Sequence, residues 1–145
     1  MTTNQQITVS LEVAKRLAKA GWPQDECIFR WHETVTGSVL YPEGEEPYPG
    51  TENLASPTAE EILRRLPAHL IDRKKNGDVV GYDLHCQKLS GMEIVAGANW
   101  KLWYFRVRDG IEVAPLGNFS YGDTLANASA SMFCFLKENN LLPKL

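Results

Sequence analysis

The 145-residue chain contains only three cysteines, Cys27, Cys86 and Cys134. Their spacing fits neither a disulfide framework nor a zinc site, so we expect reduced and mostly buried thiols. The chain also lacks long apolar runs, whereas a membrane-spanning helix needs roughly 20 apolar residues. Residues 1–6 carry no charge and no signal-peptide pattern. These absences predict a cytoplasmic protein that does not contact a membrane.

Positive charge is not in excess. The 15 Lys and Arg residues stand against 18 Asp and Glu, which gives a net charge of −3, and acidic residues cluster in residues 43–52. Because neutralisation of phosphates by basic side chains supplies most nucleic-acid affinity, this balance disfavours nucleic acid as a partner. Phosphate-binding loops, dinucleotide fingerprints, nucleophile elbows and metalloprotease helices are absent, so we expect no cofactor.

What the chain does contain is a dense run of aromatic and β-favouring residues at positions 100–108, followed by Asp109-Gly110, a strong hairpin signal. The run predicts a central β-strand. Side chains alternate between the two faces of a strand. One face would carry Lys101, Trp103, Phe105 and Val107. The other would carry Trp100, Leu102, Tyr104, Arg106 and Arg108.

Helices are expected at residues 11–20, 58–66 and 124–139, on the basis of apolar residues at helical spacing. Their N-caps would be Ser10, either Ser56 or Thr58 with Glu61 in a capping box, and Asp123. Further strands are expected at residues 27–33, 39–41 and 111–114, and Asn76-Gly77 predicts a hairpin between residues 69–75 and 79–89. Residues 92–98 fit a short strand or an irregular crossing equally well.

Together these elements predict a single α+β domain over residues 1–145, in which an antiparallel β-sheet meander packs about three α-helices chiefly on one face. Residues 1–8 would form a loose N-terminus. Residues 42–56 are rich in Pro, Gly and Glu and predict a long acidic loop, either mobile or functional.

Three segments share a pattern with known sequences: LEVAKRL with GWPQ at residues 11–24, SPTAEEIL at residues 56–63, and GDTLA through LKEN at residues 122–139. The chain resembles, through these segments, a group of small uncharacterised proteins encoded by phages and prophages. The resemblance implies a viral or mobile-element origin. It implies no activity and no catalytic or binding residues.

One candidate site combines His32 and Glu33 with Asp83 and His85, which alternate onto the exposed faces of two expected strands. If the strands were neighbours, these side chains could bind a metal ion or act as an acid–base pair. The alternative is a solvated sheet face. His69, beside a helix end, is expected to be a surface residue that compensates the helix dipole. Adjacent strand residues point to opposite faces, so His85 cannot activate Cys86.

A second candidate is a binding surface. Arg30, Arg106 and Arg108 could form a cationic patch near Trp100 or Tyr104, suited to an acidic or aromatic partner. The alternative is a solvated strand end. Any of the four tryptophans, Trp22, Trp31, Trp100 and Trp103, that remains exposed would point to an interaction surface.

The sequence thus favours a non-enzymatic, phage-type accessory protein. Its sheet face or its acidic loop would contact a protein partner or a second copy of the chain. The alternative is a small metal-dependent or acid–base enzyme that uses His32, Asp83 and His85. A third class, nucleic-acid binding through the three arginines, would show a steep salt dependence.

Overall fold

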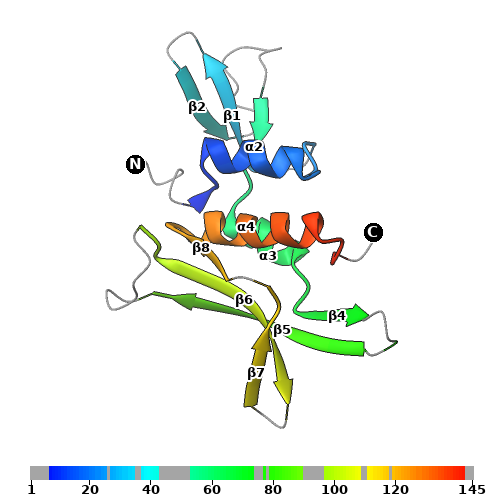
Figure 1. The fold of residues 1–145 in the computed structure, drawn as a ribbon. Helices are drawn as coiled ribbons and strands as arrows, with labels where there is room; N and C mark the ends of the chain where they lie inside the picture. The colour runs from blue at the N-terminus through cyan, green and yellow to red at the C-terminus, as the bar shows by residue number, and fades with distance from the viewer. Residues whose placement is uncertain are drawn as a thin grey trace.

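Two antiparallel sheets enclose a layer of helices (Figure 1). The computed structural model describes residues 7–25, 27–34, 37–42, 53–73, 77, 79–89, 97–108, 111–117 and 119–142. The α+β class and the antiparallel pairing are confirmed, but the strands form two sheets instead of one. The division arises because the chain passes through helix α3 (Ala59–Arg65) between the third and fourth strands.

The smaller sheet has the order β2-β1-β3, from β1 (Phe29–Thr34), β2 (Gly37–Pro42) and β3 (Asn53–Ala55). Trp31 at its centre lies opposite Leu40 on one side and Leu54 on the other. Helix α2 (Leu11–Lys19) packs against β3, and the Ser10 hydroxyl accepts a hydrogen bond from the Val13 amide, which confirms the expected N-cap. Strand β3 lies inside the expected loop 42–56, so that expectation was wrong for residues 53–55; residues 43–52 lie outside the described part.

The expected loose N-terminus is only partly described. Residues 1–6 lie outside the described part, whereas Thr8 forms a β-bridge with Thr58 and is fully buried together with Val9. The end of this segment is therefore fixed to the residue that caps α3.

The larger sheet contains β4 (His69–Arg73), β5 (Val79–Lys88), β6 (Trp100–Arg108), β7 (Ile111–Pro115) and β8 (Ser120–Gly122). Strand β6 pairs with β5 along one edge, and with β8 and then β7 along the other. The expected central strand is thereby confirmed. Strands β4 and β5 pair as the hairpin predicted around residues 76 and 77, and Gly77 has a φ of +90°. Residues 92–96 and the turn at residues 109 and 110 lie outside the described part.

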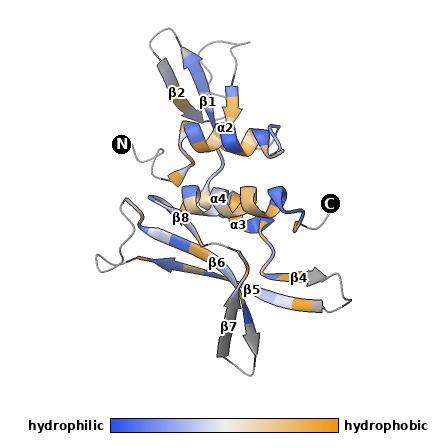
Figure 2. Ribbon diagram, viewed as in Figure 1, coloured by the Kyte–Doolittle hydropathy of each residue, from blue (hydrophilic) through white to orange (hydrophobic). Residues whose placement is uncertain are grey.

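Helices α3 and α4 (Leu125–Glu138) lie between the sheets, with α4 against β6, β8, α2 and α3. Neighbours on several sides explain why α4 is buried over most of its surface, and Figure 2 shows apolar residues concentrated along it. Thr58 and Glu61 form the expected capping box of α3. The N-cap of α4 is Thr124, so the expectation of Asp123 was wrong by one residue. The Asp123 carboxylate instead accepts hydrogen bonds from the Thr124 amide and the Asn127 side chain.

The alternation expected for β6 matches its burial. Leu102 and Tyr104, on the face toward the helices, are fully buried in the core with Leu70 and Met132. None of the helices in the described residues is both long and apolar enough to cross a membrane.

Candidate functional site

One face of the larger sheet points away from the helix layer (Figure 1). Because Leu102 and Tyr104 face the helices, Lys101, Trp103 and Phe105 must point to the opposite side. Strand register adds their neighbours, since His85 lies opposite Trp103 and Tyr121 lies opposite Lys101. Helix α4 packs on the other side, where Leu102 and Tyr104 belong to the core.

Aromatic rings form a continuous row across this side of the sheet. The ring centroids of His85 and Phe105 lie 3.8 Å apart, and that of Trp103 lies 6.1 Å from Phe105. Phe119 follows at 6.0 Å from Trp103 and 6.4 Å from Tyr121. We call these five side chains the aromatic face. The two contacts of Phe119, with Trp103 and with Tyr121, have edge-to-face geometry, one of the arrangements that the ring quadrupole favours.

Lys101 holds its ammonium group over the middle of the aromatic face. Its Nζ lies 4.6 Å from the centroid of Trp103 and 4.1 Å from that of Phe119, so it makes two cation–π contacts. Phe119 is 38% exposed, whereas Phe105 is covered by its neighbours and only 6% exposed. The surface therefore combines rings that are fixed by mutual packing with an accessible edge. Residues that dominate the binding energy of interfaces occur in well-packed clusters of this kind.

An ion-pair candidate lies on the same side of the sheet. His69 Nδ1 and Asp83 Oδ1 are 2.8 Å apart across strands β4 and β5, and about half of each side chain is exposed. The expectation that His69 compensates a helix dipole missed this pair, because His69 begins a strand. Counting equal distances from the turn at residue 76 would have placed it opposite Asp83.

The structure does not bring the candidate enzyme residues together. His32 belongs to β1 in the smaller sheet, whereas Asp83 and His85 belong to β5 in the larger one. His32 is also 2% exposed, not on a solvated face. No group of three or more metal-ligating side chains occurs in the described part of the chain.

The candidate binding residues are likewise separated. Arg30 lies in the smaller sheet, where its guanidinium donates hydrogen bonds to the Asn53 side chain and the Gln24 carbonyl. Tyr104 is fully buried, its hydroxyl donates to the Pro67 carbonyl at 2.6 Å, and burial raises the pKa of its phenol. Arg106 is half-buried in β6. The Arg108 side chain lies outside the described residues.

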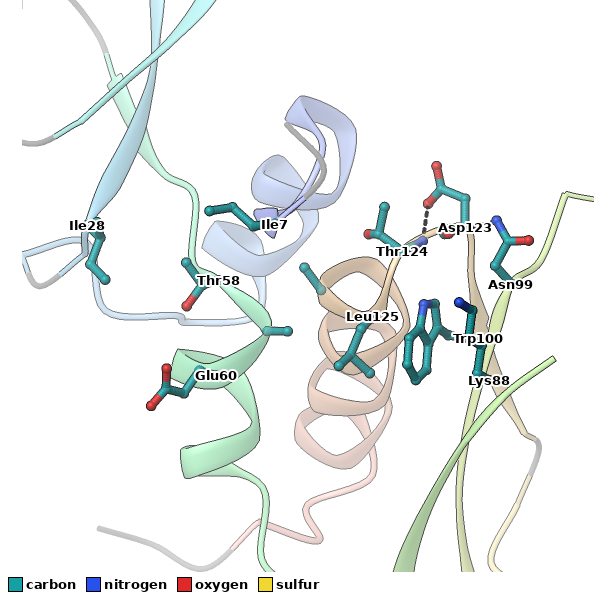
Figure 3. A pocket seen from close by; sticks show the side chains of 12 residues that line it. Ile7, Ile28, Thr58, Glu60, Lys88, Asn99, Trp100, Asp123, Thr124 and Leu125 are labelled. Atoms are coloured by element: carbon teal, nitrogen blue, oxygen red, sulfur yellow. Dashed lines mark hydrogen bonds between the residues drawn. The ribbon is translucent and has the colours of Figure 1, made fainter. Parts of the chain in front are cut away.

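Trp100 is the candidate binding residue with the most accessible surroundings. It lines a hollow of about 850 Å³ at the N-terminal ends of α3 and α4. Figure 3 shows Trp100 beside Leu125, with Ile28 and Thr58 on the side of the smaller sheet. Ile28 is 54% exposed. This hollow is a second accessible apolar region, but it contains only one of the four tryptophans.

The cysteines do not form a reactive centre. Cys27 and Cys134 are buried as expected, and burial raises the pKa of the Cys134 thiol. Cys86, by contrast, is exposed, so the expected burial of the thiols does not extend to this cysteine. Partial burial nevertheless raises the pKa of its thiol. A raised pKa leaves less of the nucleophilic thiolate at neutral pH.

The aromatic face is thus the surface at which the described residues concentrate accessible rings, and sequence reasoning had assigned only part of it. No protein-family model, curated protein or solved structure matches the chain.

Proposed function

We propose that the protein is a non-enzymatic interaction module that binds a protein partner through the aromatic face. The observation that carries the proposal is the row of five rings on the side of the larger sheet away from the helices. Aromatic side chains lose little conformational entropy on binding and bury a large apolar area, which is why they are enriched at interface centres.

The charges on this side favour a protein over a nucleic acid. Lys101 is engaged by two rings, and the nearby carboxylate of Asp83 would repel phosphates. The chain as a whole carries a net charge of −3. Nucleic-acid binding by stacking needs a positively charged groove beside the rings. The resemblance of the helical segments to small phage and prophage proteins is compatible with an accessory protein of a mobile element.

The test compares two surface substitutions of similar chemistry in a pull-down from the source cell. Phe119→Ser removes the accessible edge of the aromatic face, and Ile28→Ser removes an exposed apolar residue from the side of the smaller sheet. We expect one protein to be retained by the wild type and by Ile28→Ser, with about a tenfold loss for Phe119→Ser.

Light scattering during size-exclusion chromatography, over a range of protein concentrations, shows whether the partner is a second copy. Equal retention of every captured protein by both variants would contradict the proposal. A persistent monomer with no captured protein would contradict it as well. Tight binding of a single-stranded oligonucleotide that is lost in Phe119→Ser would replace the protein partner by a nucleic acid.

A further inference from the structure

A second surface lies at the opposite end of the helices from the Trp100 hollow. Helices α2, α3 and α4 end on the same side of the molecule (Figure 1), and their ends surround a hollow of about 300 Å³. Its apolar lining comes from Pro23, Leu66, Pro67, Phe133 and Leu142. A hollow of this size and lining accommodates one or two apolar side chains.

The rim of this hollow is cationic. Arg64, Arg65 and Lys137 line it, and none of the described residues in its lining is acidic. Arg64 is neutralised by Glu60 at 2.6 Å, but Arg65 and Lys137 form no ion pair with the described residues. The Arg65 guanidinium lies 5.0 Å from the centroid of the Trp22 ring, which holds it beside the opening.

A neighbouring hollow of about 610 Å³ shares Lys137 and adds Arg16, Lys19 and Glu138. Arg16 pairs with Glu138 at 4.0 Å, so the cations of this hollow without an ion pair among the described residues are Lys19 and Lys137. Basic residues in the last turn of a helix stabilise its dipole, and this accounts for their position along each helix. The helix dipole does not explain why apolar side chains line the hollow between Arg65 and Lys137, two cations without an ion pair among the described residues. In a chain with a net charge of −3, these cations gather at one end of the helix layer.

We propose that this surface binds an acidic peptide segment of a partner protein. The segment inserts one apolar side chain into the smaller hollow while its carboxylates contact Arg65, Lys137 and Lys19. The spread of cations over two adjoining hollows fits several carboxylates along a peptide better than a single carboxylate on a small ligand. The proposal involves none of the residues of the aromatic face.

The test is fluorescence anisotropy with a labelled peptide that has one leucine among aspartates and glutamates. One control peptide replaces the leucine by serine, and another replaces the acids by their amides. The protein variants are Lys137→Glu on the rim of this surface and Lys88→Glu in the Trp100 hollow. Both substitutions change the net charge by the same amount. Both lysines carry no ion pair in the described part. Circular dichroism shows whether both variants keep the fold.

We expect the acidic peptide to bind the wild type, with about a tenfold loss for the serine peptide because the apolar side chain is no longer buried. Lys137→Glu should weaken binding at least about tenfold, and Lys88→Glu less than about twofold. Phe119→Ser should have no effect, so this result is independent of the aromatic face. Absence of binding, equal affinity for the serine peptide, or equal losses in both lysine variants would overturn the proposal. So would oligothymidine binding as tightly as the peptide.

Discussion

Replacing Gly122 by alanine should strongly destabilise the fold. Gly122 ends β8, lies opposite Trp100 in β6 and touches the first turn of α4. A Cβ atom at this position would lie 2.4 Å from the Ala128 amide nitrogen and 2.9 Å from the Thr124 carbonyl oxygen. Both are backbone atoms and cannot rotate away. Since non-bonded heavy atoms prefer separations of about 3.5–4.0 Å, β8 and α4 must separate by roughly 1 Å.

Overpacking of this kind costs about 3 kcal/mol, a large part of the 5–15 kcal/mol that usually stabilises a domain. Gly97→Ala provides the matched control. Gly97 has a φ of +78°, and no atom of the described residues lies within 4 Å of an added Cβ, so we expect its alanine variant to carry only the left-handed backbone penalty of about 1 kcal/mol. The displacement of β8 should also disturb the aromatic face, because β8 positions Tyr121.

Urea denaturation followed by circular dichroism measures both variants. We expect the free energy of unfolding of Gly122→Ala to fall below that of Gly97→Ala by about 2 kcal/mol, with an unchanged slope against urea. Equal stabilities would refute the close packing of β8 on α4, and with it the position of the aromatic face relative to the helices.

Further predictions concern the core, a helix cap and the thiols. Tyr104→Phe should lower stability at neutral pH by about 1 kcal/mol through loss of the bond to Pro67. Because burial raises the pKa of Tyr104, the folded wild type holds the phenol proton more tightly than the unfolded chain does. The free energy of unfolding of the wild type should therefore fall as the pH rises above 10. Urea titrations at several pH values should show a shallower fall in the phenylalanine variant. Thr58→Ala should cost about 1 kcal/mol by removing the capping box of α3, and a loss below a few tenths in thermal unfolding would contradict that geometry. In the native protein, iodoacetamide should modify Cys86 slowly and leave Cys27 and Cys134 intact. Mass spectrometry identifies the modified cysteine, and modification of Cys27 or Cys134 before Cys86 would contradict this expectation.

Local signals in the sequence predicted the elements whose stability is local. The caps at Ser10 and Thr58, the hairpin at Gly77 and the strand at residues 100–108 all follow from patterns of a few neighbouring residues. Strands β3 and β8 are three residues long, too short for any periodicity to reveal, and they exist because longer strands pair with them.

The position of the site depended on contacts distant in sequence. Alternation in β6 separated Trp103 from Tyr104, but both faces carry large apolar residues, so the location of α4 decides which face is covered. The candidate metal or acid–base site required His32 and Asp83 to lie in neighbouring strands, and the passage of the chain through α3 places them in different sheets. The sequence around Phe119 carries no signal for its role, because Phe119 precedes a strand of only three residues, although its ring lies beside Trp103 and Tyr121.

The most direct test of the aromatic face as a binding surface is site-specific photo-crosslinking in the source cell. A photoreactive p-benzoylphenylalanine is placed at Phe119 in one variant and at Ile28 in another, both exposed positions. We expect one discrete crosslinked protein from position 119 that is absent from position 28. Irradiation that yields the same products from both positions, or none from position 119, would contradict it.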